Sequence, residues 1–161
     1  SGVSWDLDGH TRHAHVVDSF TFHCSFAPML SPALDITRDD YDYPLAHQMI
    51  DLWRRLSDDL LYGDYYQHTQ FHRDDDSWVV WQFDSPEKNS GFIQGIRLPN
   101  SQQGVFTVFL EGFVDDSLYI FGNPETEETR EIIGAKLKSD GFEIALAKRS
   151  GAVWLYRRES Q

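Results

Sequence analysis

Cysteines, basic residues and long apolar runs are all scarce in this chain of 161 residues. Cys24 is the only cysteine, so no disulfide can form within the chain and its stability must come from a packed core. Basic residues number 14 against 26 acidic ones, which gives a formal net charge of −12. Nucleic acid and anionic membrane surfaces repel such a chain, because binding them rests on Lys and Arg side chains that neutralise phosphate.

Apolar runs stay well below the roughly 18 residues that a membrane-spanning helix needs. We therefore expect neither nucleic acid nor a membrane among the partners of this chain. A neutral ligand such as a sugar is compatible with the charge. Nothing in the sequence indicates a cellular compartment, since a single thiol does not report the redox environment.

Large apolar side chains are abundant. Aromatic residues make up 14% of the chain and hydrophobic residues 40%, which is enough apolar surface for a packed core. The length fits one ordinary domain, or a smaller domain with an attached piece of another.

The first sixty residues predict one clear helix. Residues 16–26 mix β-branched and aromatic side chains, and are equally typical of a short buried strand and of an aromatic helical turn. From Asp42 onward the apolar residues recur at three- and four-residue steps, with Pro44 in the first turn and Gly63 as an αL stop. This stripe must pack on the rest of the chain, on a partner or on a missing remainder; it consists of Leu45, Met49, Leu52, Trp53, Leu56 and Leu60.

After Gly63 the period of the pattern changes to that of strands. Short apolar segments follow one another every 8–12 residues or so, separated by turns rich in Gly, Pro, Asn and Asp, which is typical of an antiparallel sandwich or barrel. We expect strands at 78–83, 91–98, 105–110, 117–121, 129–133, 142–146 and 152–156, and a helical turn at 135–138.

Candidate catalytic groups are weak. Four histidines cluster near the N-terminus: His10, His13, His15 and His23. Their spacing matches no zinc motif, so we expect no metal and no cofactor. Cys24 lies in an apolar segment and is more typical of core packing than of a nucleophile. Acidic residues form three clusters, at 35–42, 74–76 and 125–131. The first resembles a helix start and the other two resemble solvated turns. None forms a persuasive pair of carboxyl groups for glycoside hydrolysis.

Aromatic residues are the remaining candidates, because their rings can stack on sugars. At alternating strand positions such side chains more often belong to a core. The residues in question are Tyr62, Tyr65, Tyr66, Trp78 and Trp81.

Three sequence segments resemble one enzyme family. Residues 60–66 read LLYGDYY, residues 78–87 read WVVWQFDSPE and residues 91–99 read GFIQGIRLP. They are similar to the GDYYPLT, WxxWQFDRPE and GxxQAFRRP segments of family 36 glycoside hydrolases, the α-galactosidases and their melibiase-like relatives. Residues 110–115 and 150–157 resemble the family's later LxGLDP step and closing strand. Gln67 departs from the family's proline, and Leu98 departs from its second arginine.

This resemblance implies a mainly β fold: an antiparallel β-sandwich, preceded by a strand-plus-helix remnant of a TIM barrel. Residues 1–62 would be the C-terminal end of a (β/α)8 barrel, with its last strand at 18–23 and its exit at 29–35, and residues 63–161 the sandwich domain. The family's catalytic carboxylates lie on earlier barrel strands, so none carries over. His13, His15 and Asp18 are the candidates for a substrate-binding barrel mouth.

The resemblance therefore predicts a non-catalytic C-terminal fragment of a retaining α-galactosidase-like hydrolase. Its partner would be the missing catalytic barrel, and an α-galactoside would bind only to the complete enzyme. One alternative is a free-standing carbohydrate-binding module. Another is a dimerisation module, in which the exposed face formed by Leu45, Met49, Trp53 and Leu56 would pair with a second copy.

Overall fold

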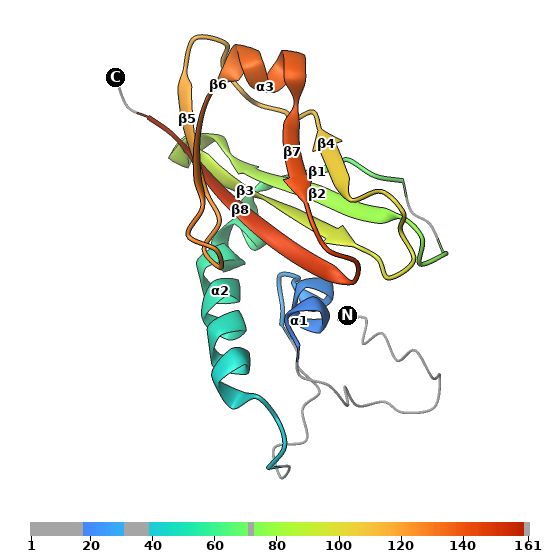
Figure 1. Cartoon of the computed structure of the whole chain (residues 1–161). Helices are drawn as coiled ribbons and strands as arrows, with labels where there is room; N and C mark the ends of the chain where they lie inside the picture. Colours follow the sequence, from blue (N-terminus) through green and yellow to red (C-terminus); the bar gives the residue numbers. More distant parts are fainter. Residues whose placement is uncertain (1–17, 31–38, 71–72, 160–161) are drawn as a thin grey trace.

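The protein is described by a computed structural model, and the described residues are 18–30, 39–70 and 73–159. It is a sandwich of two unequal antiparallel sheets with helices on the outer face of the larger one (Figure 1). The larger sheet has the order β1-β2-β3-β8-β5-β6 and the smaller one pairs β4 with β7. The strands are β1 (Asp64–Gln67), β2 (Trp78–Ser85), β3 (Ser90–Arg97), β4 (Val105–Val108), β5 (Leu118–Gly122), β6 (Thr129–Ile133), β7 (Phe142–Ala145) and β8 (Ser150–Arg158).

The mainly β, antiparallel fold is thus confirmed, and each of the seven expected strands is present within a few residues of its expected bounds. One strand escaped the sequence pattern. β1 is only four residues long and mostly exposed, so it shows no alternation of apolar side chains. The helical turn expected at 135–138 is the helix α3 (Gly134–Asp140), and a short 3-10 helix, η1 (Pro86–Lys88), connects β2 to β3.

Helix α2 (Tyr43–Tyr62) is the amphipathic helix that the sequence predicts. Asp42 caps its N-terminus by accepting a hydrogen bond from the Leu45 N–H at 3.0 Å. Gly63 ends the helix, but in an extended conformation (φ −73°) and not in the expected αL conformation. Glycine is required there by a close approach, because a Cβ atom would lie 2.6 Å from the Asp59 carbonyl oxygen.

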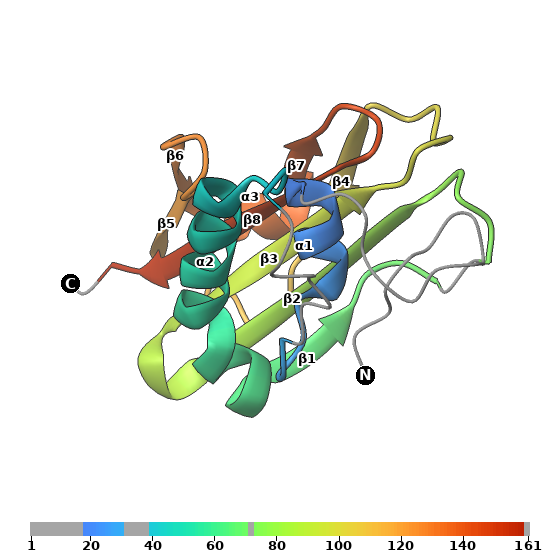
Figure 2. The same ribbon diagram turned by 90° about the horizontal axis from the view of Figure 1, so that it is seen from below.

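The apolar stripe of α2 packs on the larger sheet. Met49 and Leu56 are fully buried, and Leu45 and Trp53 pack against the same cluster, which includes Phe92 of β3. Figure 2 shows α1 and α2 lying across one face of the strands. The expectation that this stripe forms an exposed face for a second copy is therefore wrong, since the sheet of the same chain covers it.

The sequence left open whether residues 16–26 form a short strand or a helical turn. The structure has a helix there, α1 (Ser19–Ser25). The barrel strand expected at 18–23 is wrong. Asp18 is the N-cap of α1, and Phe22 and Phe26, four residues apart, both pack into the cluster beneath α2. Most of the expected strand exit at 29–35 lies outside the described residues.

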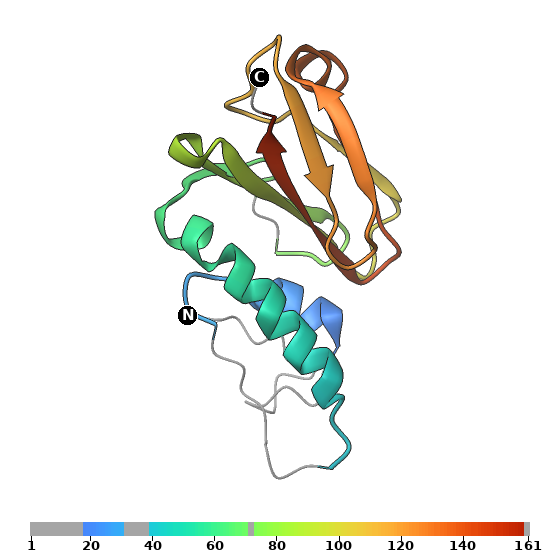
Figure 3. The same cartoon turned by 90° about the vertical axis from the view of Figure 1, so that its left-hand side faces the viewer.

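A second core fills the space between the two sheets. It joins Val80 and Ile93 of the larger sheet to Ile144 of the smaller one. Figure 3 shows this sandwich from the side, with α1 and α2 forming a layer beneath the larger sheet and α3 at the opposite end. None of the described helices is long and apolar enough to cross a membrane.

Candidate functional site

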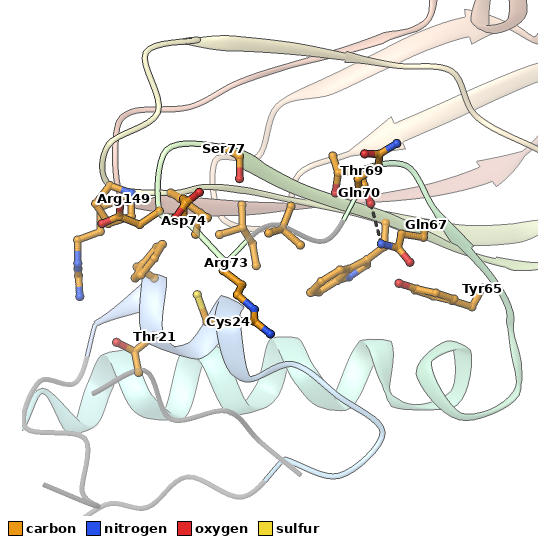
Figure 4. Close-up of a pocket in the computed structure, with 17 residues that line it drawn as sticks. Thr21, Cys24, Tyr65, Gln67, Thr69, Gln70, Arg73, Asp74, Ser77 and Arg149 are labelled. Carbon is orange, nitrogen blue, oxygen red and sulfur yellow. Dashed lines mark hydrogen bonds between the residues drawn. The ribbon is translucent and has the colours of Figure 1, made fainter. Parts of the chain in front are cut away.

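A groove remains open on the face of the larger sheet that carries the helices. Its volume is about 440 Å³, and it lies between α1 and strands β1, β2 and β3 (Figure 4). The floor is apolar and contains Val79, Trp81 and Ile96. It continues into Leu98 and Pro99 beyond the end of β3.

The strand register explains this floor. Val79 of β2 is paired with Ile96 of β3, and Trp81 with Gln94, so alternate residues of both strands project toward the helices. The opposite face of β2 carries Trp78 and Val80, which are buried in the core of the sandwich. Of the five aromatic residues considered as sugar platforms, Trp78 therefore belongs to the core, whereas Trp81 and Tyr65 line the groove.

Polar side chains form the rim of the groove. Gln67 lies two residues after Tyr65 on β1, and its side-chain amide donates to the Thr69 carbonyl at 2.7 Å. Arg73 and Asp74 lie at the other side of the groove (Figure 4). An apolar floor with a charged rim suits an apolar surface better than a strongly charged ligand.

One hydrogen-bond chain fixes helix α1 to the floor. The Trp81 indole N–H donates to Gln94 Oε1 at 2.8 Å, and Gln94 Nε2 donates to the His23 carbonyl at 2.9 Å. Gln94 and His23 are fully buried, so this chain joins the sheet to the helix in a dry environment where unpaired groups are costly.

A second anchor closes one end of the groove. The Arg149 guanidinium donates to Asp18 Oδ2 at 2.6 Å and lies 4.6 Å from the ring centroid of Phe20. Partial burial raises the pKa of Asp18, but the hydrogen bonds from the Thr21 N–H and from Arg149 outweigh it and leave the pKa below its usual value. Asp18 is thus a helix cap in an ion pair. Its expected role at a barrel mouth remains a prediction.

Cys24 lines the groove but is a poor nucleophile. Burial raises the pKa of its thiol to about 12, so the reactive thiolate is rare near neutral pH. The expectation that Cys24 serves packing and not thiol chemistry agrees with this environment.

The histidine cluster divides between described and undescribed parts of the chain. His10, His13 and His15 lie outside the described residues. His23 is buried, and its Nε2 lies 3.0 Å from Glu125 Oε2. Within the described ranges no group of three or more His, Cys, Asp or Glu side chains could hold a metal ion.

Sequence reasoning missed Gln94 and Glu125 as the partners of His23. Glu125 was expected only as part of an exposed charged hairpin, yet its side chain is mostly buried against α1. No local signal could have found this pair, because the two residues are 102 positions apart.

These features define a class of protein: a two-sheet antiparallel domain with a helical layer on one outer face and an open groove beside it. Solved structures with a similar fold include parts of several α-galactosidases. The galactosidase domain of the α-galactosidase–sucrose kinase AgaSK is 16% identical, with a TM-score of 0.70 over 94% of this chain and 21% of that chain. The α-galactosidase from Lactobacillus brevis is 14% identical, with a TM-score of 0.68 over 88% of this chain and 20% of that one.

The family 36 α-galactosidase AgaA from Geobacillus stearothermophilus, as a variant in complex with stachyose, gives a TM-score of 0.70 at 14% identity. That match covers 93% of this chain and 21% of AgaA. No protein-family model and no curated protein sequence matches the chain significantly. The resemblance seen in the sequence is confirmed at the level of fold: this chain has the architecture of the C-terminal domain of family 36 glycoside hydrolases, and it spans about a fifth of the length of those enzymes.

Proposed function

We propose that this chain is the C-terminal part of an α-galactosidase-like glycoside hydrolase and that it supports a catalytic barrel without performing chemistry itself. The observation that carries the proposal is the fold: nearly the whole chain matches one fifth of several α-galactosidases. An α-galactoside is the substrate class that the resemblance in the GDYY and WQFD segments supports.

We further propose that residues 1–62 are the end of a (β/α)8 barrel and that the groove beside α1 receives more of that barrel. The described helices leave Val79 and Trp81 of the floor only partly buried, whereas Ile96 is already buried. Barrel helices are the natural occupant, because α2 already packs on the same face through an apolar stripe.

The environments of the carboxylates favour a supporting role. Glycosidases need one carboxyl group that acts as an acid and a second that acts as nucleophile or base. Asp18 is held by Arg149 and by the first turn of α1, and Asp84 is held by Tyr156 at 2.7 Å. Asp74 and Asp75 line the groove but lie in exposed bends.

The first experiment is an activity assay of the purified chain on an aryl α-galactoside between pH 4 and 8. We expect no release of the aryl group above a buffer blank. An α-galactosidase activity that copurifies with the chain, and that the Asp18→Asn variant lacks, would overturn the proposed supporting role.

The second experiment tests whether the groove is an uncovered apolar surface. The dye ANS should bind to the chain and gain fluorescence, and Val79→Asp should remove most of that gain by placing a charge in the floor. Val105→Asp is the matched control, because Val105 is 44% exposed on the smaller sheet and should leave the dye signal unchanged. Equal loss in both variants, or no binding to the wild-type chain, would count against a docking surface in the groove.

A further inference from the structure

A second cavity lies at the opposite face of β2, at the end of the sandwich. Its volume is about 270 Å³. The turn between β2 and β3, the connection that follows β4 and the end of β8 meet there. It is separate from the groove beside α1, because Asp84 projects from β2 on the same side as Gln82, which is hydrogen bonded within the sandwich.

A buried carboxylate forms one wall of this cavity. Asp84 is 9% exposed, and its Oδ1 accepts a hydrogen bond from the Tyr156 hydroxyl at 2.7 Å. Tyr156 in turn accepts from Gln82 Nε2 at 2.9 Å. These bonds fix the orientation of the carboxylate before any ligand arrives.

The second oxygen of Asp84 is open to the cavity. No described group donates to Asp84 Oδ2. Among the described residues, the only fully buried side-chain polar atom without a hydrogen-bond partner is Arg97 Nε. Because Oδ2 also has no partner, it must be accessible and not fully buried. Gly112 borders the same space, since a Cβ atom there would lie 3.0 Å from Oδ2.

The cavity also contains a donor and aromatic rings. Arg158 lines it, and within the described part of the chain its guanidinium has no carboxylate partner. Tyr66 contributes a half-exposed ring, and Phe113 and Tyr119 close the inner wall with their ring centroids 4.4 Å apart. Acceptor, donor and aromatic surface are thus gathered around one small space.

We propose that this cavity binds a small neutral polyol of monosaccharide size, with one hydroxyl donating to Asp84 Oδ2 and another accepting from Arg158. A hydroxyl group both donates and accepts, so it can satisfy a carboxylate and a guanidinium in the same site. The volume lies just below the range of about 300–1,000 Å³ of small-molecule pockets, which limits the ligand to a single sugar ring.

The charge around Asp84 agrees with a hydrogen-bond donor as ligand. Burial, followed by the neighbouring acidic groups Asp64, Asp59 and Glu87, raises the pKa of Asp84, while the Tyr156 hydroxyl opposes the shift. A ligand hydroxyl that donates to Oδ2 would stabilise the ionised form. This inference is independent of the proposed supporting role, because the site contains neither the groove nor α1.

The test is a titration of the full chain with D-galactose and D-glucose, followed by backbone amide NMR shifts. We expect saturable shifts at millimolar sugar, centred on Gly112, Phe113 and Asn89. Asp84→Asn keeps an acceptor for Tyr156 but replaces Oδ2 by a donor, so it should weaken binding by roughly tenfold or more. Gly112→Ala should abolish binding by filling the space next to Oδ2.

Two further variants keep the result interpretable. Arg158→Ala changes an exposed residue and should weaken binding severalfold without affecting the fold, even where Gly112→Ala fails to fold. Gln67→Ala, in the groove beside α1, should leave sugar binding unchanged. The proposal is overturned if neither sugar gives saturable shifts, if the shifts centre on Trp81, or if Asp84→Asn and Arg158→Ala bind both sugars normally.

Discussion

His23 Nε2 lies 3.0 Å from Glu125 Oε2, and this contact joins helix α1 to the connection between β5 and β6. On the other side of the ring, Gln94 Nε2 lies 3.3 Å from His23 Nδ1. The arrangement suits an imidazole that donates from Nε2 to Glu125 and accepts at Nδ1 from Gln94. Gly151 packs directly on the ring, because a Cβ atom there would lie 2.5 Å from His23 Cγ.

Removing the His23 ring should therefore destabilise the fold. His23→Ala leaves a buried cavity and deprives Glu125 and Gln94 of their partner, and we expect a loss of about 2–4 kcal/mol in the free energy of unfolding. Urea denaturation measures this loss. His47→Ala is the control, because His47 is exposed on α2 and should change the free energy by less than about 0.5 kcal/mol. Equal effects of the two variants would contradict the anchoring role of His23.

Two strand glycines offer a matched test of packing between neighbouring strands. A Cβ atom at Gly91 would collide with the Phe83 carbonyl and lie 2.5 Å from the Tyr156 hydroxyl, whereas at Gly122 it would meet nothing within 4 Å. We expect Gly91→Ala to lower the free energy of unfolding by about 3 kcal/mol. Gly122→Ala should be neutral or slightly stabilising. Thermal denaturation of both variants measures the difference in stability. If Gly91→Ala were as stable as Gly122→Ala, the strands would separate easily at this point.

The packing of α2 on the sheet predicts a contrast between two leucines five positions apart. Leu56 is fully buried and Leu61 is 57% exposed. Leu56→Ala should cost about 2–5 kcal/mol, because it leaves a cavity between the helix and the sheet. Leu61→Ala should cost less than about 0.5 kcal/mol. Urea unfolding followed by tryptophan fluorescence compares them, and a small cost at Leu56 would mean that α2 does not depend on this sheet.

The ion pair of Asp18 predicts a pH dependence of stability. The pKa of Asp18 is lowered in the folded chain, so its contribution is present above the unfolded value of about 3.9 and is lost as the pH falls through the folded value. Asp18→Asn keeps the helix cap but loses the ion pair with Arg149. We expect this variant to be less stable than the wild-type chain by up to about 1 kcal/mol at pH 7.

As the pH falls through the lowered folded pKa of Asp18, the stability difference between Asp18→Asn and the wild-type chain should shrink, because the wild-type carboxyl group becomes protonated. Urea midpoints at pH 7, 4 and 2 measure the trend. Asp51→Asn serves as the control, because Asp51 forms only an exposed pair with Arg54. A difference that persists unchanged at pH 2 would attribute the effect to the helix cap and not to the ion pair.

Local sequence determined most of the secondary structure. The three- and four-residue spacing from Leu45 to Leu60 specifies α2, and the alternation from Trp78 to Phe83 specifies β2, because these periods reflect the geometry of one helix or one strand. The LLYGDYY and WVVWQFDSPE segments also pointed to the correct fold. α1 was ambiguous for the same reason: seven residues are too few to distinguish a helical period from a strand period.

Only the tertiary structure decided what these elements contact. The stripe of α2 could equally have met a second copy, and the sequence cannot choose, since an apolar face is satisfied by any apolar surface. The pairing of Val79 with Ile96 and the contact of His23 with Glu125 depend on strand register and on residues far apart in the chain. The open groove and the cavity at Asp84 arise in the same way, because a concave site is formed by several segments and belongs to none of them alone.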